Sequence, residues 1–167
     1  MKENYKSNNY PGGNLKTETY TEGDTSITKN YHTGRNAYVK EFISEKDGTK
    51  EIKHFNTDGL ISKLEYFKGD KRDGVETKYL VSKANKSIKS TKTYKDGKLH
   101  GECTTYGPLA LIIKQEVFVL GKVVLEYLRE DKESNDITSV TMIDEKSLEL
   151  LDESQRNLIQ ENIANIK

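Results

Sequence analysis

The chain has 167 residues, 33% of them hydrophobic and 32% charged, with a mean hydropathy of −0.83 and a formal net charge of zero. This composition is too poor in apolar residues for a thick globular core, but ten Tyr and four Phe exclude a disordered chain, which would be poor in aromatic residues. A thin structure with a large surface is expected instead.

Charge is distributed unevenly along the chain. Residues 1–125 hold 22 Lys and Arg against 16 Asp and Glu, whereas residues 126–167 hold 5 against 11. This asymmetry favours an acidic helix beside a sheet with Lys on its solvated face, and self-association of the two charged parts is the alternative. The one cysteine, Cys103, excludes an intramolecular disulfide, and no run approaches the ~18 apolar residues of a membrane span. A cytoplasmic protein is expected.

Aromatic residues followed by turn-forming residues recur every 10–15 residues from Tyr10 to Phe118. The runs between them alternate with a period of two: in GVETKYLV, Val75 and Thr77 share one face and Glu76 points the other way. Short alternating runs separated by turns predict consecutive antiparallel hairpins through about residue 130.

The pattern changes in the last part of the chain. Residues 136–143 (DITSVTMI) predict one more strand, and the remainder predicts a helix. Asp152 and Gln155 form a capping-box pattern, which predicts that a second helical segment begins there. The apolar stripe of the helix comprises Leu148, Leu151, Leu158, Ile159, Ile163 and Ile166. We expect this stripe to pack on the last hairpins and to cover the open edge of the sheet. The chain thus divides into a β-sheet of residues 1–130 and an acidic strand–helix extension of residues 131–167.

Two segments align without a gap at an offset of 27 residues, YFKGDKRDGVETKY (66–79) and TYKDGKLHGECTTY (93–106). The unit resembles the MORN-type repeat in its bacterial variant, Y-x-x-G-K-x-x-G-E. The best matches are YKDGKLHGE (94–102) and FKGDKRDGVE (67–76), with degenerate copies elsewhere between residues 10 and 125. The resemblance implies a mainly β protein, an elongated single-layer antiparallel meander of hairpin repeats, followed here by a C-terminal α-helix. Proteins with this repeat include antitoxin-like and immunity proteins, scaffolds and lipid-binding proteins.

The sequence shows no catalytic or metal-binding constellation. KDGKLHG (95–101) has two glycines, but a strand rather than a helix follows, so a hairpin turn at Asp96-Gly97 fits better than a phosphate-binding loop. His100 and Cys103 lack the further ligands of a zinc site and, three residues apart on a strand, face opposite ways. The carboxylates stand among lysines, which favours solvated cross-strand pairs. We therefore expect no enzyme activity, no cofactor and no metal.

The favoured hypothesis is a non-enzymatic module that blocks a partner protein (a toxin, effector or nuclease), as an inhibitor of the antitoxin or immunity type. Tyr rows on the sheet would make the contact, because Tyr offers stiff contact area with a polar tip. Packing of these Tyr beneath the C-terminal helix is equally compatible with the pattern. The alternative function is a scaffold that binds anionic lipid or nucleic acid through the basic patch Lys83–Lys98. The candidate contact residues are Tyr66, Tyr79, Tyr94, Tyr106, Lys86, Lys89, Lys92 and Lys95.

Overall fold

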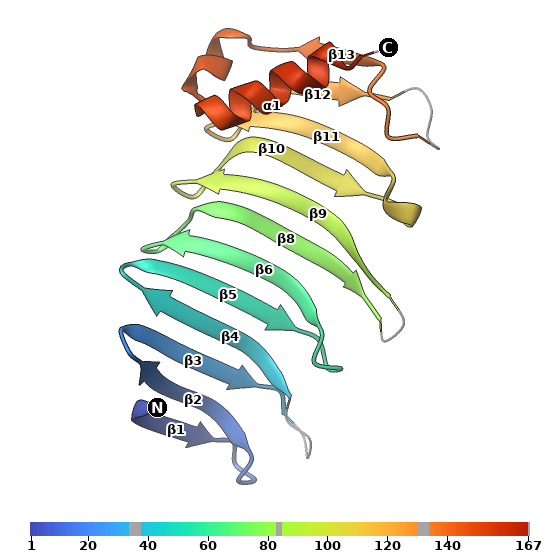
Figure 1. Ribbon diagram of the computed structural model, residues 1–167. Helices are drawn as coiled ribbons and strands as arrows, with labels where there is room; N and C mark the ends of the chain where they lie inside the picture. Colours follow the sequence, from blue (N-terminus) through green and yellow to red (C-terminus); the bar gives the residue numbers. More distant parts are fainter. Residues whose placement is uncertain (34–37, 83–84, 130–133, 167) are drawn as a thin grey trace.

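A computed structural model describes residues 1–33, 38–82, 85–129 and 134–166. These residues form one open, 13-stranded antiparallel sheet that follows chain order, with an α-helix at the C-terminal end (Figure 1). The strands are β1 (Glu3–Asn9), β2 (Leu15–Glu22), β3 (Thr25–Tyr31), β4 (Val39–Lys46), β5 (Thr49–Phe55), β6 (Ile61–Lys68), β7 (Lys71–Arg72), β8 (Gly74–Val81), β9 (Lys86–Lys95), β10 (Lys98–Tyr106), β11 (Ile112–Val119), β12 (Lys122–Leu128) and β13 (Ser139–Met142). The short β7 pairs with β6 alone. The predicted elongated single-layer meander is confirmed.

Two-residue turns close several hairpins along one edge of the sheet. Asp47-Gly48 and Asp96-Gly97 each have two positive φ angles, the type I′ geometry that matches the right-handed twist of paired strands. The hairpin turn predicted at Asp96-Gly97 is confirmed, with φ angles of 50° and 84°.

Backbone hydrogen bonds also link neighbouring hairpins along this turn edge. In each, the amide of a turn glycine donates to a carbonyl in the preceding hairpin. These bonds run from Gly69 to Gly48, from Gly97 to Arg72 and from Gly121 to Leu99, each 2.8 Å long. The turns are therefore tied to one another as well as closing their own hairpins.

The two segments aligned in the sequence have the same strand register. The equivalent cross-strand pairs are Phe67 with Arg72 and Tyr94 with Leu99, then Leu64 with Thr77 and Thr91 with Thr104. Between these pairs the second strand of each hairpin holds two extra residues, which form a bulge. Gly74 and Gly101 occupy the same place in the two bulges, with φ angles of 117° and 108°. The 27-residue offset is therefore a structural repeat.

The C-terminal segment has the predicted order of elements with different boundaries. β13 covers four residues, fewer than the predicted 136–143, and a 3₁₀ helix (Lys146–Leu150) precedes α1 (Glu153–Ala164). The predicted capping box is present. The Asp152 carboxylate accepts from the Gln155 amide at 2.8 Å, and Gln155 Oε1 accepts from the Asp152 amide at 3.4 Å.

The main apolar core lies at one end of the molecule, where α1 packs on β11 and β12 (Figure 1). Val117 and Leu125 of the sheet are fully buried, and Leu151 and Ile159 cover them from the C-terminal segment. Packing of the helical segment on the last hairpins is thus confirmed. Contrary to expectation, the helical segment does not cover the open edge of the sheet but one of its faces. Strand β13 forms the edge. The predicted burial of Leu158 is wrong, since this side chain lies about 100° around the helix axis from Ile159 and is 45% exposed.

The start of α1 contacts the bulge of β10, and we call this contact between Gln155 and residues His100 and Gly101 the helix seat. The Gln155 side-chain amide donates to the His100 carbonyl at 3.4 Å and lies directly above Gly101. A Cβ at Gly101 would overlap Gln155 Nε2 and come within 3.3 Å of Thr93 Cβ. The helix therefore needs glycine here for space as well as for the positive φ angle.

We expect Gly101→Ala to lower the free energy of unfolding by about 1–3 kcal/mol, because alanine would be strained at this φ angle and would displace Gln155. Gly12→Ala is the matched control, since nothing lies within 4 Å of a Cβ there. Urea unfolding followed by circular dichroism measures both variants. Equal midpoints for the two would contradict this account of the helix seat.

Candidate functional site

The register of the sheet assigns every side chain to one of two faces. We call the side on which α1 packs the helix face and the opposite side the ladder face. One continuous row on the helix face comprises Lys29, Phe42, Lys53, Leu64, Thr77, Thr91, Thr104, Gln115, Tyr127 and Val140. The corresponding row on the ladder face comprises Asn30, Glu41, His54, Lys63, Lys78, Ser90, Thr105 and Lys114.

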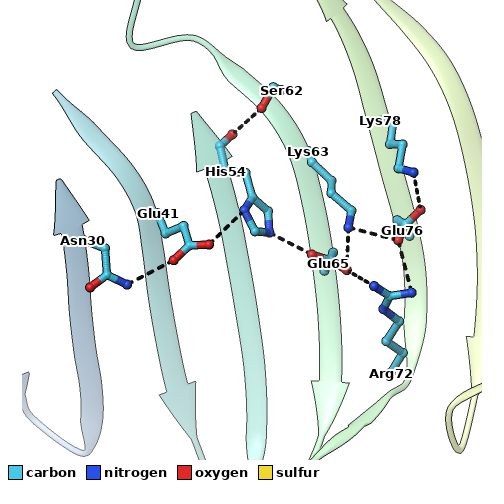
Figure 2. A network of polar contacts seen from close by, with 9 residues as sticks. All are labelled: Asn30, Glu41, His54, Ser62, Lys63, Glu65, Arg72, Glu76 and Lys78. Carbon is cyan, nitrogen blue, oxygen red and sulfur yellow. Dashed lines mark hydrogen bonds and ion pairs between the residues drawn. The ribbon is translucent and has the colours of Figure 1, made fainter. Parts of the chain in front are cut away.

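A chain of polar contacts crosses the strands of the ladder face, beginning at β3 (Figure 2). The Asn30 side-chain amide donates to Glu41 Oε2 at 3.0 Å. Glu41 Oε1 then lies 3.3 Å from His54 Nδ1, and His54 Nε2 lies 2.7 Å from Glu65 Oε2. Carboxylate oxygens therefore lie beside both ring nitrogens of His54.

The contacts continue from β6 to β8 as a cluster of alternating charges. Glu65 Oε1 lies 2.8 Å from Lys63 Nζ and 2.9 Å from Arg72 Nη2. Lys63 also lies 3.3 Å from Glu76 Oε2, and Lys78 lies 3.6 Å from Glu76 Oε1 (Figure 2). Glu65 and Glu76 thus each have two or more cationic neighbours, and Lys63 contacts both carboxylates.

These carboxylates differ from the solvated pairs expected from the sequence. Glu65 and Glu76 are 5% and 4% exposed, because the long side chains of Lys63 and Arg72 cover them. Burial by itself raises the pKa of Glu65, but hydrogen bonds from Lys63 and His54 and the charge of Arg72 outweigh it, and the pKa lies below 4.5. We interpret the ladder face as a structural network.

The helix face carries a different row at the N-terminal end, in which ammonium groups alternate with aromatic rings. Lys2 Nζ lies 4.2 Å from the centre of the Tyr20 ring, and Lys29 lies between Tyr20 and Phe42 at 5.4 and 5.9 Å. Lys53 then lies 5.7 Å from the Phe42 ring. Such contacts contribute about 0.5–1 kcal/mol each when exposed, and they hold the lysine side chains against the sheet.

The predicted tyrosine contacts do not form one row. Tyr66 and Tyr79 lie on the helix face, and Tyr66 is 37% exposed. Tyr94 lies on the ladder face, 5.3 Å beneath the Arg72 guanidinium, which belongs to the charge cluster. Tyr106 is half-buried at the end of β10, opposite Ile112.

The predicted basic patch is likewise divided. Lys86 lies on the helix face with its ammonium 4.2 Å from the Tyr79 ring, whereas Lys92 lies on the ladder face between Glu76 and Cys103. Lys89 lies at an irregularity of β9, and Lys95 ends that strand. Lys83 lies outside the described residues.

His100 and Cys103 lie on opposite faces. His100 is 3% exposed beneath the start of α1, beside Leu150 and Asp152, while Cys103 is buried on the ladder face. Burial raises the pKa of the Cys103 thiol, which disfavours the nucleophilic thiolate. Among the described residues, no group of three or more His, Cys, Asp or Glu side chains is placed to hold a metal ion.

No helix in the described parts of the chain is long and apolar enough to cross a membrane. No protein-family model matches the chain, and no curated protein matches it. Among solved structures, it is similar to a crystal structure of a Staphylococcus aureus TarM mutant in complex with fondaparinux, α-GlcNAc-glycerol and UDP. That match has a TM-score of 0.40 and 15% sequence identity, and it covers 72% of this chain and 21% of the other. A TM-score this low does not establish a shared fold.

Glu65→Gln is expected to lower the free energy of unfolding at neutral pH by about 1.5–3 kcal/mol, because Lys63 and Arg72 lose their buried counter-charge. The folded pKa of Glu65 lies below the unfolded value of 4.5, so its contribution is present above that pH and is lost as the pH falls through the folded pKa. Urea midpoints measured from neutral to acid pH should therefore fall less steeply in the variant than in the native protein. Glu22→Gln, at an exposed position of β2, is the control. Parallel pH profiles for the native protein and Glu65→Gln would contradict the network.

A second pH dependence is expected at the helix seat. Burial, with some repulsion from Lys95, lowers the pKa of His100 below 6.5, although Leu150 and Asp152 partly oppose this. Only the unfolded chain takes up this proton near pH 6.5, so stability falls as the pH drops below that value towards the folded pKa. Urea midpoints between about pH 7.5 and about pH 5.5 should decrease in the native protein and stay level in His100→Gln. An equal decrease in both would place the titrating group elsewhere.

Proposed function

We propose that this chain is a non-enzymatic protein-binding module, which blocks a partner protein with the uncovered part of its helix face. The observation that carries the proposal is the contrast between two parts of that face. Over β10–β12 it is buried beneath α1, whereas over β6 and β8 it exposes Tyr66 and Val75, which are 37% and 40% exposed. No described element lies over this second part.

The chemistry of the uncovered face suits a protein surface. Tyr66 and Tyr79 offer large, stiff contact area, and Lys86 adds positive charge on the same side of the sheet, where Lys53 is paired with Glu51 at 2.7 Å. Lysines held against aromatic rings lose little further side-chain entropy on binding, and complementary charge speeds association and fixes orientation. The resemblance of the hairpin units to MORN-type repeats supports an inhibitor of the antitoxin or immunity type.

A scaffold for anionic lipid or nucleic acid is less favoured by the geometry. Such a ligand is held by cations gathered along one groove or patch. The predicted basic residues instead divide between the two faces, with Lys86 on one and Lys92 on the other. The enzyme alternative has no convergent catalytic group to support it among the described residues.

The proposal is tested by affinity purification of the tagged chain from its native host after nuclease treatment. The native protein should recover a protein partner in stoichiometric amount. Val75→Glu, which places a carboxylate opposite Thr93 on the uncovered helix face, should weaken that complex about tenfold or more, the equivalent of at least ~1.4 kcal/mol. Titration of the isolated partner measures the loss.

Leu80→Glu is the matched control, because Leu80 belongs to the same strand, is 52% exposed and lies on the ladder face. It should bind like the native protein. Recovery of no stoichiometric protein, or equal weakening by the two variants, would overturn the proposal. Steep salt-dependent binding of nucleic acid or anionic vesicles would support the scaffold function in its place.

A further inference from the structure

The seat of α1 shows what kind of element the helix face accepts. At the bulge of β10, the Gln155 amide fills the space above Gly101 and bonds to the His100 carbonyl. This space exists because the cross-strand neighbour of the glycine is Thr93, a small residue. A helix can therefore approach the sheet closely at this point.

The same backbone recurs 27 residues earlier, where no described element covers it. Gly74 has the bulge position and positive φ angle of Gly101, and Tyr66 has the position of Thr93. A Cβ at Gly74 would meet Tyr66 Cβ at 3.0 Å, Cγ at 3.5 Å and Cδ2 at 3.6 Å. The Tyr66 side chain thus fills the place that Gln155 fills in the later repeat.

The spacing of the two seats equals the spacing of packed helices. A shift by one repeat moves the seat two strands along the sheet, from β10 to β8. Two strand spacings amount to about 9.5 Å, and packed helices lie about 8–10 Å apart. A helix on the earlier seat would therefore lie beside α1 in contact with it.

Exposed apolar side chains mark this second position. Val75 of β8 is 40% exposed, and Leu158 of α1 is 45% exposed. Leu158 and Gln155 lie on the same side of α1 relative to Ile159, and Gln155 is the residue that reaches β10. Leu158 thus lies on the flank of α1 that turns towards the earlier strands.

We propose that the partner presents an amphipathic α-helix, which lies on β8 and β9 beside α1 and makes the helix face a two-helix layer. Lys86 offers one positive charge to this helix on the same face, whereas Lys53 is already paired with Glu51 at 2.7 Å. Tyr66 selects the helix, because its ring leaves room for a small residue where α1 has Gln155. This inference rests on the proposed function and names the element that would bind.

The test uses two synthetic peptides as probes, residues 151–167 and the same peptide with Gln155→Ala. Each is titrated into the isotope-labelled full chain, native or Tyr66→Thr, and amide shifts are followed by NMR. The native protein should prefer the Ala peptide, and Tyr66→Thr, which copies the Thr93 seat, should prefer the Gln peptide. We expect the ratio of the two affinities to change at least tenfold. Any loss of helix capping in the Ala peptide is common to both proteins and cancels in this ratio.

The shifts should centre on Val75, Thr77 and Thr93. An unchanged preference, the absence of binding by all four pairs, or shifts centred on Val117 and Leu125, which would mean exchange with α1, each overturns the inference. If Tyr66→Thr fails to fold, the native protein must still bind the Ala peptide more tightly. If Val75→Glu abolishes partner binding but the peptide preference does not change, the binding face stands and the helical mode of binding falls.

Discussion

A single-layer sheet leaves most of both faces in water, so contacts between neighbouring strands must supply the stability that a core supplies in thicker proteins. In the part of the chain that the structure describes, a conventional apolar core lies only at the end under α1, built around Val117 and Leu125. Elsewhere each side chain is held by the side chains of the neighbouring strands, which lie about 4.8 Å away. The low content of apolar residues and the high content of Lys, Glu and Tyr follow from this constraint.

The two faces meet the constraint with different chemistry. On the ladder face, carboxylates are paired with Lys63 and Arg72 and contact His54. On the helix face, ammonium groups lie over Tyr20 and Phe42. The first arrangement leaves little for a ligand to bind, because a partner would have to replace contacts that are already made. In the second, the same ammonium groups are also paired with carboxylates, Lys2 and Lys29 with Glu18 and Lys53 with Glu51.

Short-range features of the sequence predicted the fold well. The alternation around Val75, the turn at Asp96-Gly97 and the capping box at Asp152 are local, and each element appears where its residues indicate. The candidate contacts were predicted less well, because Tyr66 corresponds to Thr93 in the repeat and not to Tyr94, so the alternation of side chains along a strand separates the two tyrosines. Tyr66 and Tyr94 both precede a turn, yet they lie on opposite sides of the sheet.

The network of polar contacts on the ladder face was not predicted from the sequence, because its residues come from separate strands. Glu41, His54 and Glu65 lie 11 to 13 residues apart, and only the pairing of three strands brings them together. The sequence did contain an indication of this network. Glu65 and Glu76 are separated by about the spacing of successive turns, and each has a lysine two residues away. Register, however, depends on the bulges and turns between the strands, and the residue pattern alone does not determine it.

The hydrogen bonds that join Gly69 to Gly48 and Gly97 to Arg72 have a mechanical consequence. They fix the pitch of the sheet along one margin, while the other margin is spanned by longer connections such as residues 56–60 between β5 and β6. On this second margin, side chains make the links: the Tyr10 hydroxyl donates to the Tyr31 carbonyl at 3.0 Å, and His32 Nε2 lies 3.4 Å from the Phe55 carbonyl. Backbone atoms thus set the strand spacing along one margin and particular side chains set it along the other, so a substitution can change the spacing more easily along the second.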